Sequence, residues 1–148
     1  LNRMMDVDPV LALEIRTDVW EGRVLLTGKV SDPVLSSEME FLVRRDGRVR
    51  AVYNQVQVRG RENSQGSFVG DVWIETQIKL KLLAEDGVTS VDYRWQSVGS
   101  QVHVIGRAKS AKERETVLRI IRGVQGVREV HSFIEVRPHG APAPAGAR

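Results

Sequence analysis

The sequence predicts an α+β protein built from two copies of one small unit, each a three-stranded sheet covered by helices. The first observation is an internal repeat, because a shift of 78 residues lays residues 10–59 on residues 88–137 without a gap. Gly28 then falls on Gly106, among other identities. The second observation is that the same local signals, for a hairpin, a capped helix and a final strand, recur in both copies.

Each copy opens with a predicted hairpin, because apolar and polar residues alternate on both sides of a short glycine-bearing turn. A helix follows, capped by Asp32 with Pro33 at its first position in the first copy. In the second copy Ser110 and Glu113 are spaced as a capping box. A valine-rich strand then closes each unit. The predicted hairpin strands span 11–20, 23–29, 89–97 and 101–107, and the closing strands lie near 49–58 and 127–136.

Residues 71–85 are predicted to form the first helix of the second unit, with Asp71 as its N-cap. Ile74, Ile78 and Leu82 recur at i, i+4 and i+8, which predicts one face turned toward a core. Extending the repeat backwards aligns the first residues of the chain with the end of this helix, so the first unit is expected to lack most of its own. The predicted organisation is a first unit at 1–59, a polar glycine-rich linker at 60–70, a second unit at 71–137 and a disordered tail at 138–148.

Composition narrows the classes of function. The net charge of +3 is small and dispersed, which argues against nucleic-acid binding. The chain has no cysteine, which excludes disulfides and thiol chemistry. It contains no apolar run long enough to span a bilayer. Its first residue is not methionine and no signal peptide is visible, so we expect a fragment or a processed form whose targeting segment is not in this chain.

Catalytic signatures are missing from the sequence. His103, His131 and His139 do not have the spacing of metal ligands. No phosphate-binding loop or nucleophile elbow occurs. We therefore expect a protein that is not an enzyme and needs neither a cofactor nor a metal.

The helix at 71–85 carries a second apolar stripe on the side opposite its core face, and a soluble helix needs only one. Indole rings favour membrane interfaces, and neighbouring lysines can reach lipid phosphates. A packed tryptophan between the two units is the plainer alternative, and Trp20 and Trp95 are expected to pack across strands. The predicted site comprises Trp73, Thr76, Gln77, Lys79, Leu80, Lys81 and Ala84.

These features together resemble the BON domain (bacterial OsmY and nodulation). The features that match are the glycine closing the second strand, at Gly28 and Gly106, the capped helix after it, and the spaced valines, glycine and isoleucine of residues 124–136. The first copy departs from this last motif, with Asp46 and Arg48 in place of a valine and a glycine. The resemblance covers nearly the whole chain except the tail and implies α-β-β-α-β units in tandem.

The resemblance also implies a function. In one family member with two units, the first helix of the second unit binds anionic phospholipid such as phosphatidylglycerol, and its tryptophan enters the membrane. Position by position this implies Trp73 as the inserted residue and residues 71–85 as the contact surface. It further implies a periplasmic location at the inner face of the outer membrane, where the protein supports envelope integrity, with a lipid-anchoring cysteine upstream of Leu1 or absent.

Two other uses of the same stripe remain open. In the first, the protein is a periplasmic stress or interaction module and the stripe binds a protein partner. In the second, the stripe is a contact between the two units. Replacement of Trp73 by glutamate separates these hypotheses, because it would change vesicle binding in one case and thermal stability in another.

Overall fold

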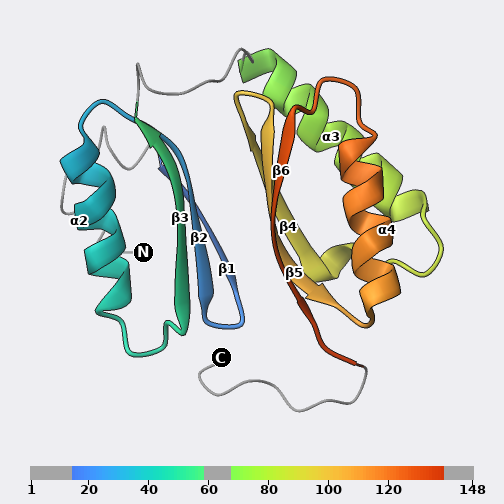
Figure 1. The fold of residues 1–148 in the computed structure, drawn as a ribbon, viewed down its shortest axis with the longest axis horizontal. Helices are drawn as coiled ribbons and strands as arrows, with labels where there is room; N and C mark the ends of the chain where they lie inside the picture. Colours follow the sequence, from blue (N-terminus) through green and yellow to red (C-terminus); the bar gives the residue numbers. More distant parts are fainter. Residues whose placement is uncertain (1–14, 59–67, 139–148) are drawn as a thin grey trace. The chain divides into compact units, whose positions relative to one another are not determined.

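The computed structural model describes residues 15–58 and 68–138, which belong to two compact units (Figure 1). In the described residues each unit contains one three-stranded sheet, with one helix packed on it in the first unit and two in the second, so the predicted α+β class is confirmed. The predictions for the incomplete first helix and for the tail from residue 139 onward lie outside the described residues, as does most of the predicted linker.

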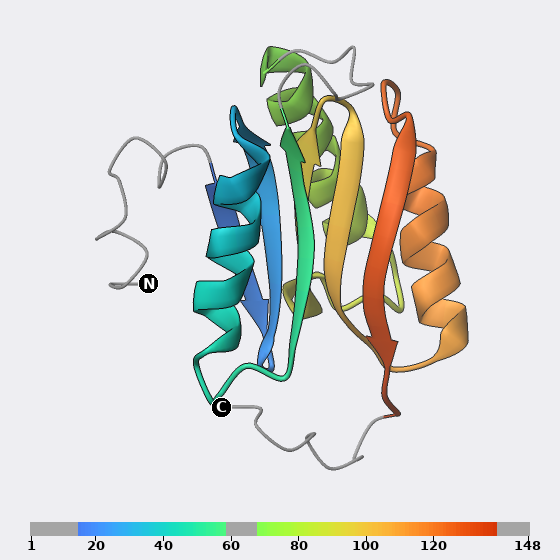
Figure 2. The same cartoon turned by 60° about the vertical axis from the view of Figure 1, so that its left-hand side comes forward.

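The first unit is a hairpin followed by a helix and a parallel strand. Its sheet order is β1-β2-β3, with β1 antiparallel and β3 parallel to β2. A parallel pair needs a crossover connection, and α2 supplies it by packing along the sheet (Figure 2). Met39 of α2 is buried against Val24 and Leu26 of β2. The elements are β1 (Ile15–Trp20), β2 (Arg23–Val30), α2 (Pro33–Arg44) and β3 (Ala51–Val58).

The second unit repeats this topology, and its described residues begin with a further helix. The sheet order is β4-β5-β6, and both helices of the unit lie on the same face of the sheet (Figure 1). Every bound of β4, β5, α4 and β6 lies 78 residues after that of its counterpart in the first unit, so the repeat read from the sequence is a repeat of structure. The elements are α3 (Phe68–Ala84), a 3-10 turn (Ser90–Asp92), β4 (Tyr93–Val98), β5 (Gln101–Ala108), α4 (Ala111–Arg122) and β6 (Glu129–Val136).

Both hairpins turn through two residues with positive φ, which matches the twist of the flanking strands. In the first unit these are Glu21 at 48° and Gly22 at 77°. In the second they are Gly99 at 58° and Ser100 at 65°. Each turn therefore places one non-glycine residue in the left-handed region, which costs roughly 1 kcal/mol unless other contacts stabilise it.

The predicted helix starts are confirmed in α2 and half confirmed in α4. The Asp32 carboxylate accepts a hydrogen bond from the Val34 N–H at 2.9 Å, and Pro33 begins α2. At α4 the Ser110 hydroxyl accepts from the Glu113 N–H at 3.1 Å, as a capping box requires. In the reciprocal bond of a capping box, the Glu113 carboxylate would accept from the Ser110 N–H. Here it accepts from the N–H of the preceding residue, Lys109.

The Glu113 carboxylate is instead the centre of a buried network. It accepts hydrogen bonds from the Lys109 N–H at 3.1 Å and from the Tyr93 hydroxyl at 2.8 Å. Burial, followed by the bond to this carboxylate, raises the pKa of Tyr93 above its ordinary value. The start of α4 is thereby tied to the first residue of β4.

Two predicted boundaries are wrong. Residues 90–92, predicted as strand, form the 3-10 turn, in which the Asp92 N–H donates to the Thr89 carbonyl at 3.0 Å. Residues 68–70, predicted as linker, are the first turn of α3, which ends at Ala84. The sequence indicated a linker at these positions because glycine is common in loops, but Gly70 lies inside the helix.

Candidate functional site

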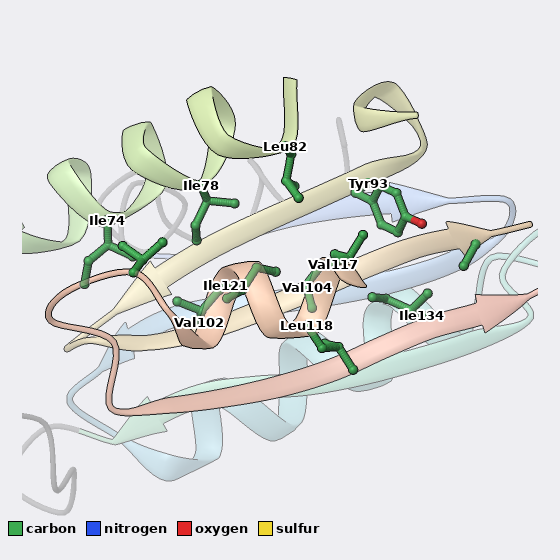
Figure 3. Packing of buried hydrophobic residues seen from close by; sticks show 12 residues of the cluster. Ile74, Ile78, Leu82, Tyr93, Val102, Val104, Val117, Leu118, Ile121 and Ile134 are labelled. Atoms are coloured by element: carbon green, nitrogen blue, oxygen red, sulfur yellow. The ribbon is translucent and has the colours of Figure 1, made fainter. Parts of the chain in front are cut away.

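The inner face of α3 belongs to the core of the second unit. Ile74, Ile78 and Leu82 are at most 2% exposed, as their spacing predicted. Figure 3 shows all three pointing from α3 toward the sheet, where Val102 and Val104 meet them. Burial of such side chains stabilises a fold by about 1.5–3 kcal/mol each, so this face fixes how α3 is rotated about its axis.

The acidic residues of α3 also point inward. The carboxylate of Asp71 accepts three hydrogen bonds from the β4–β5 region: from the Ser97 hydroxyl at 2.7 Å and from the Gly99 and Ser100 N–H groups at 2.8 Å. The prediction that Asp71 caps the helix is therefore wrong, because α3 begins three residues earlier and this carboxylate serves a distant turn.

Glu75, one turn further along α3, contacts the same strand. Its carboxylate accepts from the Ser97 N–H at 2.9 Å, and its carbonyl accepts from the Trp95 indole N–H at 3.1 Å. Trp95 also packs against the hydrophobic core, which agrees with its predicted structural role. Asp71 and Glu75 together hold the N-terminal half of α3 against β4.

The outer face of α3 carries the predicted site. Six of its seven residues are exposed, and Gln77 is half-buried at the edge. Trp73 is 45% exposed and Leu80 is 56% exposed, so the indole is not enclosed within the core of its own unit. The full set, in chain order, is Trp73, Thr76, Gln77, Lys79, Leu80, Lys81 and Ala84.

Three further apolar residues extend this face, and the sequence analysis missed them. Val69 is 76% exposed, Val72 is 46% exposed and Leu83 is 61% exposed. Projected at about 100° per residue, all three fall on the side opposite Ile78. Val69 was overlooked because the predicted helix began at residue 71, after it. Val72 and Leu83 lie within the predicted helix and could have been found by projecting every apolar residue around its axis.

Charge on α3 is separated by sign. The helix has four charged residues, of which Lys79 and Lys81 are exposed while Asp71 and Glu75 are half-buried. The two carboxylates accept the hydrogen bonds described above, and within the described residues the two lysines form no ion pair. The outer face therefore combines apolar side chains with positive charge alone.

Two histidines elsewhere in the unit lie side by side. His103 and His131 are paired across β5 and β6, and their rings stack with centroids 4.8 Å apart. Burial, with a smaller contribution from His131, lowers the pKa of His103 to about 4. Across residues 15–58 and 68–138, no group of three or more metal-ligating side chains could hold a metal ion. In that same part of the chain, no helix has the length and apolarity needed to cross a membrane.

The fold and this helix define a tandem pair of small α+β units that presents one apolar, basic helix face. The model of the BON domain matches residues 3–60 and 70–138. The chain therefore belongs to the BON-domain family and contains two BON domains in tandem.

Three relatives place the chain within that family. A protein of Anaplasma centrale, described as an uncharacterized protein in the gshII 5' region, is 35% identical over 123 residues, which cover 83% of this chain and 82% of that protein. Osmotically-inducible protein Y of Escherichia coli is 24% identical over 135 residues, or 90% of this chain and 67% of the relative. Outer membrane lipoprotein DolP of Haemophilus influenzae is 26% identical over 118 residues, or 78% of this chain and 61% of the relative. The chain is a tandem BON protein similar to DolP.

Proposed function

We propose that this protein binds the surface of an anionic phospholipid membrane through the outer face of α3, without catalysing a reaction. The observation that carries the proposal is the composition of that face. It presents exposed Trp73, Leu80 and Leu83 beside exposed Lys79 and Lys81. A lipid surface of negative charge offers both an apolar interior and phosphates to such a helix.

The inward orientation of the Asp71 and Glu75 carboxylates also supports an anionic membrane as the partner. A second copy of this helix would bring lysines against lysines, and like charges disfavour that contact. Exposed acidic residues on the helix would repel an anionic surface, but Asp71 and Glu75 are engaged with β4 and its turn. The charge of the outer face is thus complementary to an anionic partner.

The expected affinity is modest. A lysine near an anionic membrane contributes about 1 kcal/mol, and partial burial of a tryptophan or leucine adds about 1–2 kcal/mol. Binding also costs orientational freedom. The sum predicts weak, reversible attachment of a single α3, which a second attachment point would strengthen.

The proposed setting is the bacterial envelope. One relative is named an outer membrane lipoprotein, and this supports a site at the inner face of the outer membrane, in the periplasm, where the protein would help maintain envelope integrity. Phosphatidylglycerol, an anionic lipid, is the proposed ligand.

Vesicle co-sedimentation tests the proposal. The full chain should sediment with vesicles that contain phosphatidylglycerol and much less with vesicles of phosphatidylcholine alone. Trp73→Glu should lower the affinity at least about tenfold, because it replaces an inserted indole with a charge that repels phosphates. Phe41→Glu is the matched control, since Phe41 is an exposed aromatic residue on α2 of the first unit, 63% exposed.

Each result decides between the hypotheses. Loss of binding in Trp73→Glu with an unchanged melting temperature and normal binding by Phe41→Glu supports the proposal. A lowered melting temperature with unchanged vesicle binding would overturn it and make the face a contact between the units. No binding of the wild-type chain to either vesicle would also overturn it and would favour a protein partner for α3.

A further inference from the structure

The exposed apolar residues of α3 extend from its first turn to its last. Val69 and Leu83 are the two ends of this row, and at 1.5 Å per residue they lie about 21 Å apart along the axis. Between them Val72, Trp73 and Leu80 are between 45% and 56% exposed. A flat apolar surface could therefore contact the helix along its whole length.

The polar residue in the middle of this row is internally satisfied. The Thr76 hydroxyl donates to the Val72 carbonyl of its own helix at 2.9 Å. A hydroxyl with such a partner enters an apolar medium at a much lower cost than one that loses its bond to water. The row is therefore continuous and apolar in its chemistry, although its sequence is interrupted by a threonine.

The outer face of α3 has fewer positive charges than exposed apolar side chains. Lys79 and Lys81 are separated by about 200° around the helix, so they border the apolar row on opposite sides. Attraction to an anionic surface is worth about fivefold in affinity for each lysine, hence about 25-fold for both. Transfer of a half-exposed Leu or Trp side chain out of water is worth about five- to thirtyfold in affinity, and a valine contributes less. The five apolar side chains together therefore contribute more to total affinity than the two lysines.

We infer that α3 discriminates between membranes by how loosely their acyl chains pack, in addition to the preference that its lysines give for anionic headgroups. This inference rests on the proposed function. Bulky apolar side chains can enter an interface only where gaps between lipids admit them, and a helix with few cations cannot compensate by charge. The lipid chemistry recognised is thus an anionic bilayer rich in unsaturated chains.

The test varies acyl chains at constant headgroups. Vesicles of equal diameter and equal phosphatidylglycerol fraction are made with dioleoyl or with palmitoyl-oleoyl chains, and dissociation constants are measured for the full chain. The wild type should bind the dioleoyl vesicles at least about fivefold more tightly. Leu83→Ser should reduce that preference, whereas Thr76→Val, which keeps the shape and removes the hydroxyl, should retain it.

A lysine variant separates charge from packing. The double variant with Lys79→Gln and Lys81→Gln should lose most of the preference for phosphatidylglycerol over phosphatidylcholine while it keeps the preference for dioleoyl chains. Equal binding of the wild type to both chain types, together with loss of binding in Trp73→Glu, would overturn this inference and leave the proposed function intact. Absence of wild-type binding to all vesicles would overturn both.

Discussion

Replacement of Asp71 by alanine should destabilise the second unit, because this carboxylate holds the β4–β5 turn to α3. Three hydrogen bonds at 2.7–2.8 Å are lost, two of them from the N–H groups of Gly99 and Ser100. Bonds to a charged acceptor contribute about 1.5–3 kcal/mol each, but the site is half-exposed and the contributions are not additive. We expect the free energy of unfolding to fall by about 2–4 kcal/mol, which includes the loss of support for the left-handed Ser100.

Urea unfolding followed by tryptophan fluorescence measures this change. Trp20 is the only tryptophan of the first unit, so a Trp20→Phe background leaves Trp73 and Trp95 to report on the second. The control is Asp86→Ala, which removes an exposed carboxylate just beyond the end of α3 and should change the free energy by less than about 0.5 kcal/mol. If Asp71→Ala were as mild as this control, the carboxylate would not be what holds the turn.

Two further predictions concern the interior of the second unit. The folded state favours neutral His103, whose pKa is lowered from 6.5 to about 4. The free energy of unfolding should therefore be highest above about pH 6.5, and it should fall by up to about 3 kcal/mol as the pH drops to about 4, because the unfolded state gains a proton first. His103→Leu should flatten this dependence in thermal melts, and an unchanged slope would contradict the assignment. Gly106→Ala should lower the melting temperature strongly or prevent folding, because a Cβ there would lie 2.3 Å from the Asp92 carbonyl oxygen, whereas Gly47→Ala, with open space around it, should be tolerated.

Local signals were sufficient to predict most elements. Asp32 and Pro33 act on the start of α2, which follows them directly, and Glu21-Gly22 forms a turn between adjoining strands. In both cases the interacting residues are close in the sequence and can be recognised from it. The stripe of Ile74, Ile78 and Leu82 was likewise legible, because its spacing matches one face of a helix. The repeat then carried each assignment from one copy to the other.

Long-range contacts account for what was missed. Asp71 looked like a helix cap because aspartate commonly is one, but its hydrogen-bond partners lie 26 to 29 residues further along the chain. The Glu113 network and the stacked His103 and His131 also join residues from different elements. None of these contacts has a signature in the spacing of neighbouring residues.

The exposed face of α3 was predicted at its centre and missed at its ends. Trp73 and Leu80 were identified from their position opposite the core stripe, and both are exposed. Val69 was lost with the misplaced helix start, and Leu83 was not assigned to either face. A complete projection of residues 68–84 would have shown an apolar row with the spacing 4-3-4-3 through Thr76.

The burial of Ile74, Ile78 and Leu82 has a consequence for the energetics of attachment. Many amphipathic segments are unfolded in water and become helical only at a lipid interface, so part of their interaction energy is spent on ordering the backbone. Here the helix is already folded by its own core before it meets any surface. The proposed attachment would therefore be a rigid docking event, and circular dichroism of the chain should show the same helix content with and without vesicles.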